Sequence, residues 1–314
     1  MLRLAYKVDL RNYKVVEKKF NPRYVEIHLI PTDFENQKLM NRKLKDISKI
    51  FNLEQLSIHF PWQFNLNHNS WSTFISTLRM ISENFHSVNK VFLNFHIIPD
   101  YPKEFLKTFS MKELARLKKF CLIHSAATIQ LAQKLLNEFS TNIVLTLENN
   151  DHTSDANRPI IIFNAAEDFG YVKMTKRLKI CVDVCHVAMN QLYFVSGRGE
   201  VISLEVDRHF YKGIPKSLKP KFRDGKLDVT NYFSSMRKDI AFFHVSGCKS
   251  YVKKEGNFGI EIGSKGDVIN WERFIENVKR FGKRELMLVI ETKKAHVNFD
   301  EVEKSYETLS EVIY

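Results

Sequence analysis

The chain has 314 residues, of which 44% are hydrophobic, and it carries a formal net charge of +12 at pH 7. That length suits one large α/β domain as well as two smaller ones, and the composition is that of an ordinary globular protein. No stretch approaches about eighteen uninterrupted apolar residues, and the first residues, MLRLAYKVDL, lack the apolar core of a signal peptide. We therefore expect a cytoplasmic protein with no membrane partner.

The four cysteines, Cys121, Cys181, Cys185 and Cys248, form no CxxC pair and are too few for a disulfide framework. We expect reduced thiols, which are typical of the cytosol. The positive net charge is compatible with a polyanionic partner, and a solvated lysine-rich surface explains it nearly as well.

Eight short apolar runs, taken in chain order, have the composition of β-strands. They are Leu2–Val8, Tyr24–Ile30, Leu56–His59, Val91–His96, Ile143–Glu148, Leu178–Asp183, Ile240–His244 and Leu286–Glu291. Several of them, such as VFLNF, IVLTL and LMLVI, are almost continuously hydrophobic. That pattern is typical of parallel strands covered by helices on both faces.

Amphipathic helical patterns lie between most of these runs, at 35–51, 70–85, 126–139, 270–281 and 299–313. Strand and helix alternating eight times predict a single (β/α)8 barrel, or TIM barrel, over residues 1–314. A doubly wound open sheet is the alternative. Two segments exceed what a barrel requires: a basic helical stretch at 101–120, and a long basic insertion at 195–239 after the sixth strand.

Six of the eight runs end on a residue type that binds metals, namely His59, His96, Glu148, Asp183, His244 and Glu291. The carboxyl ends of parallel barrel strands meet at one mouth, where the active sites of this fold lie. Carboxylates clustered there repel one another unless cations compensate them. Mixed imidazole and carboxylate ligands suit zinc, manganese or iron. The pattern therefore predicts a metal site, with His186 as a seventh candidate in the loop after Asp183.

Each of these residues also has an ordinary structural explanation. A single histidine at a strand end is more often hydrogen-bonded than metal-bound, and a carboxylate after a strand is often a helix cap. Six such residues in one register are hard to explain separately, which favours the metal site. Other histidines are assigned to packing or to the surface: His28, His124, His152, His209 and His296.

Five short segments carry a resemblance to a known family. HFPWQFNL, which starts at His59, resembles the H-x-P-Y-x-x-N-L motif of the endonuclease IV family of apurinic/apyrimidinic endonucleases. KICVDVCH, which ends at His186, is similar to that family's C-x-D-T-C-H, and HVSGCK, which starts at His244, to its H-x-N-D-S-K. VIETKK keeps a Glu-Thr pair, and VLTLENN resembles both the family's L-E-N strand end and the L-E-N-D-D of UV-damage endonucleases. Together the matches are typical of the wider superfamily of xylose-isomerase-like barrels.

The resemblance implies two or three divalent metal ions per chain. Zinc is the preferred assignment, and manganese or iron are the alternatives. The implied ligands are His59, His96 and Glu148 for one ion, Glu148, Asp183, His244 and Glu291 for a second, and His186 for a third. Glu148 or Glu291 would orient the attacking hydroxide. The third position departs from the family, which has an Asp-x-His pair where this chain has Asn257 and Gly259. Glu255 or Glu261 would have to supply the ligand that the Asp-x-His pair supplies in the family.

Substrate binding is assigned to one aromatic and several basic residues. Trp62 takes the aromatic position of the first motif, where it would stack on a base or else pack under a loop. The residues assigned to phosphate contacts are Lys249, Lys216, Lys219, Lys221 and Arg223, the last four in the loop 211–226. A solvated basic loop without a partner explains those four equally well.

The activity implied by the resemblance is a metal-dependent phosphodiesterase that cleaves DNA at abasic or damaged sites, with no protein partner. The pair His59 and His96 and the positive charge favour this function. The alternative is a sugar isomerase or epimerase of the same superfamily, which would need one divalent ion at Glu148, Asp183, His244 and Glu291. An iron-dependent oxidative peptide-modifying enzyme, or a metal-binding protein without turnover, ranks lower.

Overall fold

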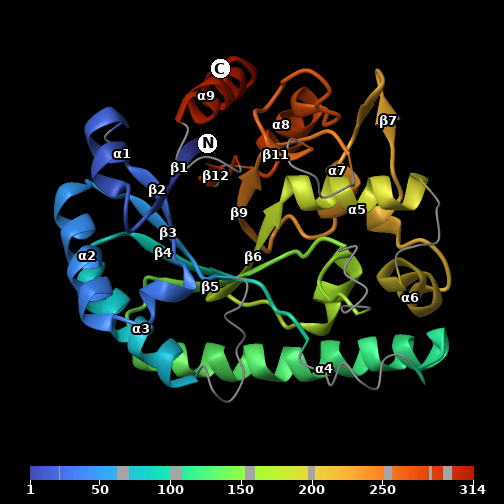
Figure 1. Cartoon of the computed structure of the whole chain (residues 1–314), viewed down its shortest axis with the longest axis horizontal. Helices are drawn as coiled ribbons and strands as arrows, with labels where there is room; N and C mark the ends of the chain where they lie inside the picture. The colour runs from blue at the N-terminus through green and yellow to red at the C-terminus, as the bar shows by residue number, and fades with distance from the viewer. Residues whose placement is uncertain are drawn as a thin grey trace.

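The computed structural model describes residues 1–20, 22–61, 71–99, 108–152, 160–196, 202–250, 257–282, 285–292 and 299–314. Within these ranges, eight parallel strands close into a barrel in the order β1-β12-β9-β6-β5-β4-β3-β2. Helices surround the strands (Figure 1). The predicted (β/α)8 barrel is confirmed, and the doubly wound open sheet is wrong because β1 pairs with both β2 and β12.

The barrel strands agree with the predicted runs to within two residues at either end. They are β1 (Leu2–Asp9), β2 (Tyr24–His28), β3 (Gln55–His59), β4 (Lys90–Phe95), β5 (Ile143–Glu148), β6 (Leu178–Asp183), β9 (Ile240–Val245) and β12 (Leu286–Ile290). Because β4 and β12 end one residue earlier than predicted, His96 and Glu291 are the first residues after their strands.

The main outer helices are α1 (Tyr13–Phe20), α2 (Gln37–Ile50), α3 (Trp71–Asn84), α4 (Met111–Leu135), α5 (Val184–Ser196), α8 (Trp271–Lys279) and α9 (Phe299–Ile313). In Figure 1, α1 to α3 lie on one side of the barrel, α4 runs beneath it, and α5 lies on the opposite side. No helix among the described residues is both long and apolar enough to cross a membrane.

Helix α4 joins two segments that the sequence analysis treats separately, the basic stretch at 101–120 and the helical pattern at 126–139. It begins at a capping box, in which Ser110 Oγ accepts from the Glu113 amide and Glu113 Oε2 accepts from the Ser110 amide at 2.8 Å. The helix continues without interruption to Leu135, and the short 3-10 turn η3 (Leu136–Glu138) follows it.

The long segment after β6 folds into short elements rather than an extended loop. After α5 come α6 (Ile202–Tyr211), η5 (Lys216–Leu218), the hairpin β7 (Phe222–Arg223) and β8 (Lys226–Leu227), and α7 (Thr230–Phe233). The hairpin turn is Asp224-Gly225, with φ of 52° and 74°. Two-residue hairpin turns require such positive φ values, which Asp-Gly adopts readily. The remaining short elements are η1 (Pro31–Asp33), η4 (Ala166–Tyr171), β10 (Gly247–Cys248) and β11 (Phe258–Ile260).

Hydrophobic side chains fill two separate regions. A large cluster packs between the strands and the helices. A small one draws on most of the strands and corresponds to the barrel interior: Ala5, Tyr24, Phe92, Val144, Cys181, Phe242, Met287 and Val289. Successive side chains of a strand point to opposite faces, so interior positions recur at every second residue.

Each interior series changes from apolar to polar toward the carboxyl end of its strand. On β5, Val144 is followed by Thr146 and Glu148 at the alternate positions, and on β12, Val289 is followed by Glu291. The apolar cluster therefore forms the floor beneath a polar mouth. The fold places strand-end residues from opposite sides of the barrel in one small space.

Candidate metal centre

The six residues that end the predicted strands converge at the mouth of the barrel. Parallel register sets His28 beside His59 across β2 and β3, and Asp183 beside His244 across β6 and β9. Ligand atoms of His59, His96, Glu148, Asp183, His244 and Glu291 fall into overlapping groups in which all atoms lie within 4.8 Å of one another. Four of the six side chains are buried, and His96 and Glu291 are half-buried.

Glu148 lies at the centre of this cluster. Its Oε2 is 3.1 Å from His59 Nε2, and its Oε1 is 3.1 Å from His244 Nδ1 and 3.5 Å from His96 Nε2. Asn94 donates a hydrogen bond to the same Oε2. One carboxylate thus faces three imidazoles, so it would be available as a ligand to either of two neighbouring metal positions.

Three potential ligand groups contain this carboxylate, and two of them consist only of histidines and carboxylates. The first of these two, which we call the tetrad, consists of Glu148, Asp183, His244 and Glu291, and the second consists of His59, His96 and Glu148. The remaining group is Glu148, Cys181 and His244. A divalent ion lies about 2.0–2.2 Å from nitrogen and oxygen ligands, so ligand atoms around one ion are roughly 3–4 Å apart. Both groups, whose ligand atoms lie within 4.8 Å of one another, approach that size.

His59 and His96 each direct one ring nitrogen at Glu148 and anchor the other. His59 Nδ1 lies 2.7 Å from the Phe60 carbonyl oxygen, and His96 Nδ1 lies 3.0 Å from Asn150 Oδ1. Metal-binding histidines ordinarily donate the second N–H to such an acceptor, which fixes the tautomer and the ring orientation. Both rings are therefore oriented as ligands that bind through Nε2.

His186 follows the same pattern, and its ring centroid lies 5.9 Å from that of His96. Its Nδ1 lies 3.0 Å from the Asn149 carbonyl oxygen, and its Nε2 lies 3.5 Å from Asp183 Oδ2. Asn149 also accepts a hydrogen bond from the Asp183 amide at 2.6 Å, so it orients both residues.

His244 is turned the other way. Its Nδ1 faces the tetrad, 2.7 Å from Glu291 Oε2, while its Nε2 lies 2.8 Å from Glu26 Oε2. Ser57 donates to that same Glu26 oxygen at 2.8 Å. A buried carboxylate behind a histidine is a common way to orient the ring toward an ion and to raise its basicity.

The structure balances the buried carboxylates with two cations. Burial opposes the charged form of His244, but Cys181, Glu148 and Glu26 outweigh it and hold the pKa of His244 well above its ordinary value. Burial also acts against the Lys7 ammonium, but Glu291 and Glu26 raise its pKa above the ordinary value. Both groups are therefore protonated in the metal-free protein.

Asp183 lacks comparable compensation. Burial raises the pKa of its carboxyl to about 6, and the opposing effect of His186 is not sufficient to cancel this. For Glu148, burial acts in the same direction, but His244, His96 and His59 hold its pKa well below the ordinary value. A cation bound beside Asp183 would remove the cost of ionising it.

The donor set fits a divalent ion. Glu291 Oε2 is buried and lies 2.7 Å from His244 Nδ1, but among the described residues no donor is aligned for a hydrogen bond to it. Two ligand atoms that are close together but not aligned as donor and acceptor are arranged like neighbours around a shared centre. Three carboxylates and one imidazole suit zinc, manganese or iron.

Sequence reasoning missed the second ring of interior residues, and it assigned His28 to packing or the surface. Three polar residues face the barrel interior two positions before a residue at the mouth: Lys7 before Asp9, Glu26 before His28, and Asn94 before His96. All three contact the cluster directly. His28 lies against His59, with ring centroids 5.1 Å apart. The available signal was a polar residue at every second position of an otherwise apolar strand.

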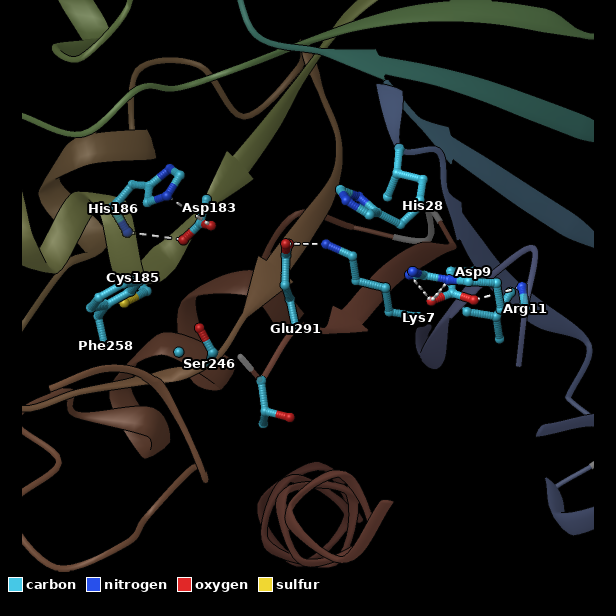
Figure 2. Close-up of a pocket in the computed structure, with 14 residues that line it drawn as sticks. Lys7, Asp9, Arg11, His28, Asp183, Cys185, His186, Ser246, Phe258 and Glu291 are labelled. Carbon is cyan, nitrogen blue, oxygen red and sulfur yellow. Dashed lines mark hydrogen bonds and ion pairs between the residues drawn. The ribbon is translucent and has the colours of Figure 1, made fainter. Parts of the chain in front are cut away.

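A cavity of about 390 Å³ opens above the tetrad (Figure 2). Asp183 and His186 lie on one side of it in the figure, Lys7 and Arg11 lie on the other, and Glu291 lies between them. The lining residues are Lys7, Val8, Asp9, Arg11, His28, Ile30, Asp183, Cys185, His186, Ser246, Phe258, Gly259, Glu291 and Thr292. The volume is within the usual range of small-molecule sites.

The residues assigned to nucleic-acid contacts do not gather at this cavity. Trp62 lies outside the described residues. The basic residues Lys249, Lys216, Lys219, Lys221 and Arg223 are all exposed, and none of them lines the cavity. DNA as a partner stays a prediction that no observation tests.

At the predicted third metal position, His186 faces the cavity, as does Gly259. Glu261 lies 3.8 Å from Lys304 and does not line the cavity, and Glu255 lies outside the described residues. Among the described residues, His186 belongs to no group of three or more potential ligands.

No protein-family model matches the sequence, and no curated protein does. Solved structures match the fold over almost the whole chain. D-psicose 3-epimerase from Clostridium cellulolyticum H10 has a TM-score of 0.58 and 10% identity, with 98% of this chain and 99% of that chain covered. D-allulose 3-epimerase from Methylomonas sp. has a TM-score of 0.56 and 12% identity, with 99% and 98% covered. The IolI protein with a bound zinc atom has a TM-score of 0.55 and 11% identity, with 99% and 98% covered.

These similarities overturn the expected function. The prediction of a hydrolase that cleaves DNA at abasic or damaged sites is wrong, because the matching barrels include sugar epimerases. Of the resemblance to endonuclease IV, the solved structures support the barrel fold and not that family in particular. The pair His59 and His96, which favoured the nuclease, is compatible with either function because the tetrad is complete without it.

Proposed function

We propose that this protein is a metal-dependent sugar isomerase or epimerase, which moves a proton on a carbon next to a carbonyl group. The observation that carries the proposal is the tetrad, whose four ligand atoms lie within 4.8 Å of one another and two of whose residues, Asp183 and Glu291, line the cavity. The fold similarity to sugar epimerases supports it.

Glu148, Asp183, His244 and Glu291 would hold one divalent ion. When bound, that ion supplies Lewis-acid polarisation of a carbonyl or hydroxyl oxygen. Zinc is our first assignment because imidazole and carboxylate ligands suit it, with manganese and iron as alternatives. His59, His96 and Glu148 offer a second ion position beside the first.

The proton transfer is assigned to the carboxylates that reach the cavity. Glu291 lines it with 24% of its side chain exposed, whereas Glu148 is 1% exposed and does not line it. Glu291 can therefore accept a proton from a substrate carbon, and Lys7 holds its carboxylate in place. Asp183, the other tetrad carboxylate that lines the cavity, is assigned the exchange of a proton with the opposite face of that carbon.

The test is exchange of carbon-bound hydrogen in D2O, followed by proton NMR, for a panel of ketoses and aldoses with zinc-, manganese- or iron-loaded protein. We expect one sugar to exchange and to convert, and Asp183→Asn to abolish the exchange. Glu285→Gln is the matched control, since Glu285 contacts Arg3 and Gln55 away from the cavity. Absence of exchange with every sugar and every metal would sink the proposal.

Metal content gives a second readout. Elemental analysis is expected to find one ion per chain at the tetrad, or two if the histidine group also binds. His96→Ala then removes one equivalent and leaves the other, because His96 belongs only to the second group.

A further inference from the structure

The two walls of the cavity differ in chemistry. The β6 side carries the tetrad residue Asp183 together with His186, whereas the β1 side carries two cations, Lys7 and Arg11 (Figure 2). If a sugar carbonyl lies at the tetrad, the far end of the substrate must lie against the second wall. That wall therefore decides which sugars fit.

Arg11 is held in place before any ligand arrives. Its Nε and Nη2 donate to Asp9 Oδ2 at 3.2 and 2.6 Å, and Asp9 is anchored by the backbone amides of Arg11 and Asn12 at 2.6 and 3.0 Å. Asp9 is 5% exposed, but the Arg11 side chain is 58% exposed. An arginine has five N–H donors, and Asp9 uses only two of them.

Lys7 lies between Arg11 and the tetrad. Its Nζ donates to Glu291 Oε1 and lies 4.0 Å from Glu26 Oε1. His28 lines the same wall, and its buried Nδ1 has no hydrogen-bond partner among the described residues. Several polar groups on this side thus face the cavity with donor or acceptor capacity to spare.

We propose that the substrate is an anionic sugar, and that Arg11 binds its phosphate or carboxylate group on the β1 side of the cavity. A planar guanidinium binds such groups with two parallel hydrogen bonds. Because Asp9 already orders the side chain, binding costs little rotational entropy. The position of the sugar carbonyl at the tetrad rests on the proposed function. Binding of an anion by Arg11 does not depend on it.

The chain contains a matched control for Arg11. Arg23 also pairs with a carboxylate, that of Glu54, and its side chain is 61% exposed, close to the 58% of Arg11. Of these two arginines, only Arg11 lines the cavity. Arg11→Gln and Arg23→Gln therefore remove the same charge from similarly exposed side chains.

The experiment is calorimetric titration of zinc-loaded protein with D-ribulose, D-ribulose 5-phosphate, D-glucuronate and inorganic phosphate. We expect one of the two anionic sugars to bind at least tenfold more tightly than D-ribulose, and which of them does so separates phosphate from carboxylate. Arg11→Gln should lower that affinity about 10- to 100-fold, as expected when a hydrogen bond to a charged group is lost. It should leave the affinity for D-ribulose unchanged, and Arg23→Gln should behave as the wild type.

The inference is overturned if D-ribulose binds as tightly as the anionic sugars or more tightly. It is also overturned if Arg11→Gln leaves the affinity for the anionic sugars unchanged, since the anion would then bind the metal instead. Titration requires no turnover. Arg11-dependent anion binding without hydrogen exchange on any sugar would therefore refute the isomerase and leave the anion site standing.

Discussion

At the scale of single residues, the two asparagines after Glu148 organise the metal centre. Asn149 binds the backbone of Asp183 through both ends of its amide, at 2.6 and 3.2 Å. Asn150 accepts from His96 Nδ1 at 3.0 Å and donates to the Ile162 carbonyl at 2.7 Å. Consecutive amides thus orient ligands on both sides of Glu148.

Asn150→Ala is expected to weaken metal binding about 10- to 100-fold, because outer partners of ligating histidines typically contribute that much. Competition with a chelator measures the affinity. Asn142→Ala is the control, since Asn142 donates to the Phe85 and Val88 carbonyls at 2.9 and 2.7 Å, away from the cluster. Unchanged affinity in Asn150→Ala would mean that His96 is not a ligand.

At the scale of elements, a fully buried charge network joins α4 to α6. Lys118 of α4 lies 2.6 Å from Asp207 of α6 and 3.3 Å from Asp168 of η4, and it donates to Asn164 at 3.0 Å. Asn164 in turn donates to Asp207 at 2.6 Å. No charge in this network is exposed, so each member depends on the others.

Lys118→Met is expected to lower the free energy of unfolding by about 3–5 kcal/mol, because it leaves two buried carboxylates without their cation. Denaturant unfolding measures the change. Lys119→Met, at the exposed neighbouring position, should stay within about 0.5 kcal/mol of the wild type. Adding Asp207→Asn should recover part of the loss, and equal effects of the two lysine substitutions would contradict this assignment.

The same network predicts a pH dependence of stability. Burial raises the pKa of Asp168 to about 6, despite the opposing Lys118 and the hydrogen bond from Tyr211, while Asp207 adds to the increase. The folded state then holds this proton more tightly than the unfolded state, whose aspartate pKa is about 3.9. The contribution of Asp168 to the free energy of unfolding should therefore fall as pH rises from about 4 to 6, by at most about 3 kcal/mol, and level off above that.

Asp168→Asn removes this slope. Urea unfolding at several pH values between about 4 and 7 compares the two proteins. Parallel profiles for the variant and the wild type would exclude Asp168 as the titrating group.

At the scale of the whole molecule, the barrel is expected to fold without metal, because protonated Lys7 and His244 compensate the carboxylates. A chelator should lower the Tm by roughly 5 °C without abolishing the transition, since an ion at 100 times its Kd contributes about 2.7 kcal/mol. Differential scanning calorimetry with and without chelator measures this. Loss of the folded state on chelation would show that the two cations do not suffice.

The architecture could be predicted from the sequence because strand and helix periodicities are local. Runs such as VFLNF on β4 and LMLVI on β12 are buried along almost their whole length, as covered parallel strands must be. The sequence predicts α4 as two separate helical segments. The structure shows one helix that begins at the capping box of Ser110, and the periodicity of the two segments does not reveal that they join.

The sequence by itself determined which residues end the strands, and in a parallel barrel that is enough to bring His59, Glu148, Asp183 and His244 together. Only the tertiary structure decided what surrounds them. Lys7 contacts Glu291 and Glu26 contacts His244, at sequence separations of 284 and 218 residues, and no local pattern encodes such a contact. The exposed lysines lie away from the cavity for the same reason, because net charge carries no information about where the charges lie.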